Sequence, residues 1–170
     1  MPLGPYQGHM LVPGMGSPVY TAEHDLAGLI YGSPHLCTFL THAVIDGSTE
    51  DTGNTGSVTT LRPGLVMAQH DTTQKWHVFD NGGSNELNIA RGILVQLGLN
   101  TQLDGSDTDR FLATILVGGV VNPEAVCIAA SSDYGLAKTA AGLNVRKALM
   151  YSIRFSDDFM GLVPLTFASR

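Results

Sequence analysis

The chain has 170 residues, of which 44% are hydrophobic and 14% are charged, and its formal net charge is -6. This length predicts one globular domain, and so few charged residues favour a protein that buries surface in an oligomer. Every Lys and Arg lies at or after Arg62. We therefore expect no secretory or mitochondrial leader and no nucleic-acid partner. The longest apolar stretch, Phe111–Val121, is too short to span a membrane.

Residues 1–22 are predicted to form an extended arm. The prolines Pro2, Pro5, Pro13 and Pro18 leave no room for a helix or a central strand. The arm nevertheless carries apolar side chains that would be costly to leave in water along a free tail. We therefore expect the arm to dock onto another polypeptide.

The core is expected over residues 23–155. An apolar run at 36–45 predicts a strand, and the polar segment Asp46–Ser57 predicts an exposed loop. Val58–Leu61 and Leu65–Ala68 are predicted strands joined by a turn at Arg62-Pro63-Gly64.

The second half of the core continues with strands and ends in a helix. The turn residues Asn81-Gly82-Gly83-Ser84 and the acidic segment Asp104–Asp109 predict loops between the later strands. Apolar residues spaced by three and four positions predict one amphipathic helix over about 136–151, weakened by Gly142. The predicted strands are Trp76–Phe79, Ile93–Leu99, Phe111–Val121 and Ile153–Phe155, followed by an apolar tail from 156 to 170.

The titratable residues form no metal-binding or catalytic pattern. The pairs His35/His42 and His70-Asp71 lack a third ligand at a suitable spacing, so scattered surface or interface histidines are expected. The acids of Asp104–Asp109 do not follow the order of a calcium loop. Cys37 and Cys127 are far apart and are predicted to be buried free thiols.

No nucleophile or phosphate loop is recognisable either. Ser131-Ser132-Asp133 has no histidine near it in the sequence, and neither Gly14-Met15-Gly16 nor Gly118-Gly119 sits in a nucleotide-binding motif. Trp76 and Phe79 lie on a predicted strand, so core or subunit-interface packing explains them. The sequence therefore predicts a protein that is not an enzyme and uses no cofactor.

Five segments occur in the order found in a known family. Thr60-Leu61-Arg62-Pro63-Gly64-Leu65-Val66-Met67-Ala68 has a strand, a basic residue, a glycine turn and a second strand. The later segments are Gln74-Lys75-Trp76-His77-Val78, Ala90-Arg91-Gly92-Ile93-Leu94, Ala113–Asn122 and, after an alanine-rich stretch, Ile153-Arg154-Phe155. Over about 100 of the 170 residues the chain thus resembles the lambdoid bacteriophage head decoration proteins.

The resemblance implies an α+β, mainly β, fold with a β-clip-like core, one C-terminal helix and an extended N-terminal arm. It also implies a homotrimer, made in the host cytoplasm, that binds the major capsid protein on the outer surface of the virion. The trimer interface would include Trp76 and Phe79. The arm residues expected to contact the capsid are Tyr6, Met10, Leu11, Val12, Val19 and Tyr20.

Two alternatives remain open at this point. A β-rich carbohydrate- or ligand-binding module would show aromatic residues clustered on one exposed loop, and the 7% of aromatic residues here do not cluster in that way. A trimeric β-clip enzyme, such as a nucleotide hydrolase, would need an acidic or Ser/Gln-bearing substrate motif at the subunit borders, and the sequence shows none.

Overall fold

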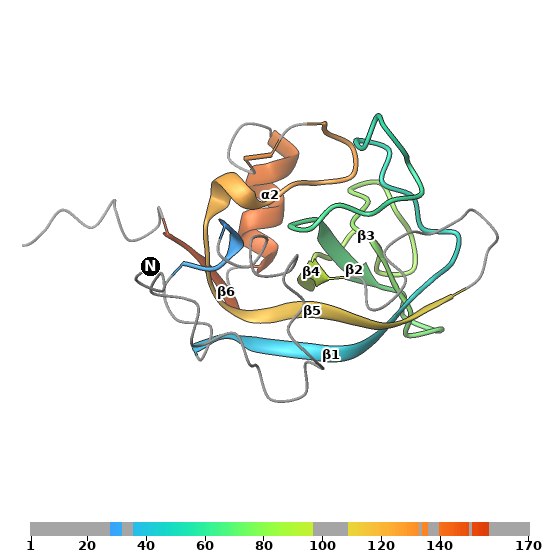
Figure 1. Cartoon of the computed structure of the whole chain (residues 1–170), viewed down its shortest axis with the longest axis horizontal. Helices are drawn as coiled ribbons and strands as arrows, with labels where there is room; N and C mark the ends of the chain where they lie inside the picture. Colours follow the sequence, from blue (N-terminus) through green and yellow to red (C-terminus); the bar gives the residue numbers. More distant parts are fainter. Residues whose placement is uncertain are drawn as a thin grey trace, which may run out of the picture.

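The computed structural model describes residues 28–31, 36–96, 109–132, 134–135, 140–149 and 151–156. These residues form a six-stranded mixed sheet with one short α-helix near the C-terminal end (Figure 1). The strands are β1 (Thr38–Ile45), β2 (Val66–Gln69), β3 (Trp76–Val78), β4 (Gly92–Gln96), β5 (Arg110–Val121) and β6 (Ile153–Phe155). The helical elements with defined bounds include the 3-10 turn η2 (Pro123–Ala125) and the helix α2 (Ala140–Leu149).

Strands β1 to β5 close into a ring. The order around it is β1-β3-β2-β4-β5, and β5 pairs back onto β1 along most of the length of β1. Neighbouring strands are antiparallel except for β1 and β3, which run parallel and meet at Ile45 and Trp76. Strand β6 lies outside the ring and pairs in parallel with the C-terminal end of β5.

The interior of the ring holds an apolar cluster to which every ring strand contributes one large side chain. Since the five strands surround this cluster, it fixes their register against one another. Each contributing side chain is at most 4% exposed, and the five are Ile45, Met67, Trp76, Leu94 and Ile115 from β1, β2, β3, β4 and β5 in turn.

Three of these strands also bury their outer faces. A second apolar cluster contains Val66, Ile93 and Leu116, each of which is next in sequence to an inward-facing residue. These side chains pack there with Val145 and Leu149 of α2. Successive strand residues point to opposite faces, so burial of both faces requires apolar side chains at consecutive positions. This two-sided burial explains why these segments of the sequence are continuous apolar runs.

The two ends of the described chain meet at the C-terminal end of β5. Val121 is the register partner of Phe155 in β6 and also forms a bridge with Ile30. Next to this bridge, the backbone N–H of Tyr31 donates to the carbonyl of Val120 at 2.9 Å. Figure 1 shows the blue segment 28–31 and strand β6 at the same end of the molecule.

Most of the predicted core elements are confirmed, as is the predicted α+β, mainly β, class with one helix near the C-terminal end. The strands expected at 36–45, 65–68, 76–79, 93–99, 111–121 and 153–155 correspond to β1 to β6, with bounds that differ by a few residues. The turns at 62–64 and 81–84 are present. The helix expected over 136–151 is α2, while the arm predicted over 1–22 and the tail after residue 156 lie outside the described residues.

The prediction of a strand at Val58–Leu61 is wrong. This segment forms turns, because its polar groups bond locally instead of to a neighbouring strand. The N–H of Thr60 donates to the carbonyl of Ser57 at 3.0 Å, and the side-chain amide of Asn54 donates to the carbonyl of Thr60 at 2.8 Å.

The loop 46–57 was expected to be exposed, and this expectation is wrong in part. Thr49 and Asp51 within it are only 4% and 0% exposed. A loop without apolar residues can be buried in this way when its polar groups find partners inside the protein. For Asp51 that partner is Arg62, at 2.7 Å.

The backbone conformation of Gly119 in β5 gives a first prediction. Gly119 has φ +137°, and a Cβ there would lie 2.6 Å from the Sγ of Cys37. We expect Gly119→Ala to lower the free energy of unfolding by about 1–3 kcal/mol, because the backbone conformation and the crowding both disfavour a side chain. Urea denaturation of the two proteins measures the difference.

Gly28→Ala is the matched control, because a Cβ at Gly28 meets no atom within 4 Å. Equal unfolding midpoints for the two alanine variants would contradict the strained geometry assigned to Gly119.

Candidate binding surfaces

Four large apolar side chains are exposed on segments that pair with β5 or lie next to its pairing partners. Tyr31 is 57% exposed, Leu36 81%, Leu40 40% and Tyr151 95%. We call this set the terminal apolar surface. Exposed apolar residues are ordinary when single, whereas several on neighbouring segments are candidates for contact with another macromolecule.

Each member of the terminal apolar surface is held against β5 by the backbone or by its chain neighbour. Leu40 is the register partner of Ile115, and Leu36 precedes Cys37, whose Sγ lies beside Gly119. The residue after Tyr151 is Ser152, and its carbonyl accepts the N–H of Gly119 at 3.2 Å. Segments far apart in the sequence are thereby gathered around one stretch of strand.

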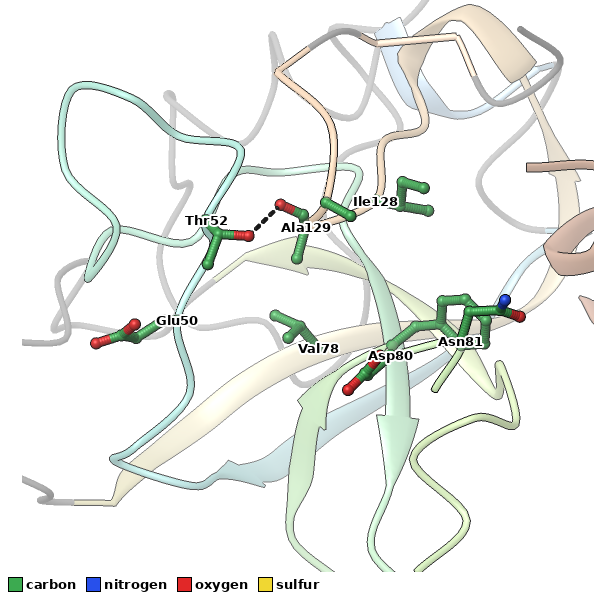
Figure 2. Close-up of a pocket in the computed structure, with 9 residues that line it drawn as sticks. Glu50, Thr52, Val78, Asp80, Asn81, Ile128 and Ala129 are labelled. Carbon is green, nitrogen blue, oxygen red and sulfur yellow. Dashed lines mark hydrogen bonds between the residues drawn. The ribbon is translucent and has the colours of Figure 1, made fainter. Parts of the chain in front are cut away.

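A separate pocket of about 320 Å³ lies between the end of β3 and two loop segments (Figure 2). Its buried lining includes Phe79, Ile128 and Ala129, which are 6–7% exposed, while Glu50 and Asp80 are exposed. We call this the side pocket. Its full lining is Glu50, Thr52, Val78, Phe79, Asp80, Asn81, Ile128, Ala129 and Ala130.

The side pocket presents carboxylates on both sides of an apolar centre. Figure 2 shows Glu50 and Asp80 on opposite sides of Val78, and Thr52 donating from its hydroxyl to the carbonyl of Ala129 at 2.7 Å. One oxygen of Asp80 accepts the N–H of Gly82 at 2.9 Å, which fixes the side chain in its turn. The lining thus combines a hydrophobic floor with negative charge at its edge.

A buried ion pair connects two of the segments that line this pocket. The guanidinium of Arg62 donates to both carboxylate oxygens of Asp51, at 2.7 and 2.8 Å. It also donates to the carbonyls of Ser131 and Ser132, at 2.8 and 3.0 Å. The Arg62 side chain is 11% exposed and that of Asp51 is 0% exposed, so both charges depend on these partners. The hydrogen bond to Asp51 raises the pKa of Arg62 above its ordinary value.

A second polar cluster joins the start of β3 to Asp109, the residue before β5. The ammonium group of Lys75 lies 2.8 Å from Asp109 and 3.4 Å from Asp46, and His77 lies 3.8 Å from Asp46. Burial, opposed by the charge of Asp46, lowers the pKa of His77. The His70 and His77 ring centroids are 6.0 Å apart, a proximity that the sequence did not indicate.

The chemistry-bearing residues considered in the sequence are dispersed. Among the residues that the structure describes, no group of three His, Cys, Asp or Glu side chains could hold a metal ion. His70 lies 3.2 Å from Asp71, but His35 lies outside the described residues. Ser131 and Ser132 serve as carbonyl acceptors for Arg62.

The residues assigned to the trimer interface lie in the core of this chain. Trp76 is 4% exposed inside the ring, and Phe79 is 7% exposed in the outer cluster. Packing within one chain therefore accounts for the burial of both, which is one of the two explanations that the sequence left open. The arm residues assigned to capsid binding, Tyr6, Met10, Leu11, Val12, Val19 and Tyr20, lie outside the described residues.

The comparisons assign the chain to no family. Neither a scan against protein-family models nor a search of curated proteins gives a match. Within the described part of the chain, no helix has the length and apolar character needed to cross a membrane.

The Arg62–Asp51 pair gives a second prediction. We expect Arg62→Ala to lower the free energy of unfolding by about 3–5 kcal/mol, because it leaves a buried carboxylate without its cation. The control is Arg91→Ala, which removes an exposed pair with Glu86 whose side chains are both 41% exposed. That change should cost under about 1 kcal/mol. Chemical denaturation of both variants tests the contrast, and similar losses would contradict the central role of Arg62.

The thiols give a third prediction. Burial raises the pKa of Cys127 to about 12, and burial also raises the pKa of the half-buried Cys37. Because the thiolate is the reactive form, we expect a thiol reagent at pH 8 to modify Cys37 first. Cys127 should react only after unfolding in guanidinium. Mass spectrometry locates the label, with Cys37→Ser as the control, and rapid native labelling of Cys127 would contradict the expected order.

Proposed function

We propose that this protein is a bacteriophage head decoration protein, which binds the outside of the expanded capsid as a homotrimer and stabilises it. The proposal is supported by the family-like order of the five sequence segments and by the mainly β core in which they lie. The observation that carries it is the terminal apolar surface, most of which lies on segments next to the β5 end where segment 28–31 and strand β6 meet.

The position of this surface suits a capsid contact. Residues 1–27 and the chain after residue 156 are covalently joined to the core at this end. Apolar side chains of the arm and of the terminal apolar surface would therefore meet the same partner. Burial of exposed Leu and Tyr side chains is worth about 25 cal/mol per Å² of apolar area removed from water, part of which offsets the cost of association.

Capsid stabilisation of this kind needs no reaction. A protein that binds the assembled shell and not its separate subunits stabilises the shell by RT ln(1 + [L]/Kd) per site. Three arms on one trimer would bind with avidity, so contacts that are weak singly would give long residence. An extended arm would add a strand to a capsid sheet edge, with its apolar residues filling pockets.

A second candidate function is a β-rich ligand-binding module of a virion or cell surface. The side pocket favours it, because about 320 Å³ lies within the range of small-ligand sites, roughly 300–1,000 Å³. Carbohydrate recognition is less well supported than binding of other ligands, because the aromatic ring of the pocket, Phe79, is only 7% exposed and offers little stacking surface.

The fourth prediction concerns capsid binding. The full chain should elute with three times its mass of 18.0 kDa and should co-sediment with expanded, empty heads of the phage that encodes it. Leu36→Asp and Tyr151→Asp should each weaken binding about tenfold or more, because a buried charge at the contact is costly. Binding curves from co-sedimentation measure the effect.

Ile89→Asp is the matched control, since Ile89 is 43% exposed but lies outside the terminal apolar surface. It should bind like the unmodified chain. A deletion of residues 1–22 tests the arm separately and should also weaken binding. A monomer that ignores heads, or a Leu36→Asp variant that binds like Ile89→Asp, would overturn the proposal.

A further inference from the structure

We propose that the side pocket binds a lysine or arginine side chain presented by a partner polypeptide. The pocket is formed by residues 50–52, 78–81 and 128–130, which are brought together only by the fold. The inference concerns this pocket alone and holds whether or not the partner is a capsid protein.

The size and the lining of the pocket suit a long side chain with a charged end. Its volume of about 320 Å³ is close to the lower end of small-ligand sites, roughly 300 Å³. The buried floor of Phe79, Ile128 and Ala129 offers apolar contacts for the methylene stem of a lysine or arginine. Such stems pack along apolar surface while their charged heads stay near water, which is the position of the carboxylates here.

The charges around the pocket select a cation over an anion. Glu50 and Asp80 are both exposed on the lining, and carboxylates form strong charge-assisted hydrogen bonds with ammonium and guanidinium groups. The chain also has a net charge of -6, which favours encounter with a basic partner.

The cationic side chains in the neighbouring loops and strands form ion pairs with other carboxylates. Arg62 is paired with Asp51, Lys75 with Asp46 and Asp109, and Arg91 with Glu86. Within the described residues, no ion pair is formed by Glu50 or Asp80. An incoming cation would therefore meet these carboxylates without displacing an internal partner.

A polypeptide source is favoured over a free amine by the polar edge of the pocket. Asn81 follows Asp80 in the chain, lines the pocket and is exposed. An amide both donates and accepts hydrogen bonds, as a peptide backbone requires on either side of the inserted residue. A blocked lysine should therefore bind more tightly than a simple alkylamine of similar length.

The test is a titration of the full-length, isotope-labelled chain followed by amide NMR shifts. The probes are Nα-acetyl-lysine N-methylamide, its arginine and norleucine counterparts, and n-butylamine. We expect shifts at 50–52, 78–81 and 128–130 with the lysine and arginine probes, and at least tenfold weaker binding of the uncharged norleucine probe. Equal binding of norleucine would overturn the charge assignment, and equal binding of n-butylamine would overturn the polypeptide source.

Variants of the lining residues test the assigned site in a second way. The double variant Glu50→Gln with Asp80→Asn removes both charges but keeps the acceptor that Asp80 offers to Gly82, so its spectrum should retain the dispersion of the folded chain. It should bind the lysine probe at least tenfold more weakly. Glu124→Gln, an exposed glutamate outside the pocket lining, is the control and should bind normally. A folded double variant that binds like this control would refute the proposal.

Discussion

The buried pair of Arg62 and Asp51 is the interaction on which the loop architecture depends. Each of its charges is almost removed from water, so the fold has to bring the two residues together to be stable. Arg62 additionally donates to the carbonyls of residues 128, 131 and 132. One side chain thus holds together the loop after β1, the turn before β2 and the segment after η2.

The side pocket is a consequence of that arrangement. Arg62 binds within or next to two of the three segments that line the pocket. It binds Asp51 in the segment 50–52, and it binds the carbonyl of Ser131 next to the segment 128–130. The Thr52 hydroxyl adds a direct link between them through the carbonyl of Ala129. Loops fixed by buried polar contacts keep a pocket preformed, so a ligand would not have to pay the full entropy of ordering them.

Local patterns in the sequence were enough to predict most of the strands and the helix, but not how they pair. β4 and β5 are apolar runs because both of their faces are buried. The turn at residues 62–64 could be predicted because it ends in a glycine, and Gly64 adopts a positive φ of 85° there. The pairing of β1 with β5 closes the ring across about 70 residues, and no local pattern encodes such a contact. The burial of Asp51 could not be predicted because the residue lies in a polar segment. The side pocket could not be predicted because its lining comes from three segments that are separate in the sequence.

Closure of the ring also determines where a partner can bind. Each ring strand pairs with a neighbour on both sides, so within the described residues the ring offers few open backbone edges. Contacts with other molecules must then use side chains at the ends of strands and in the loops. The terminal apolar surface and the side pocket occupy such positions on different segments, one apolar and one acidic. The fold therefore exposes two chemically distinct candidate contact sites on different segments of one core.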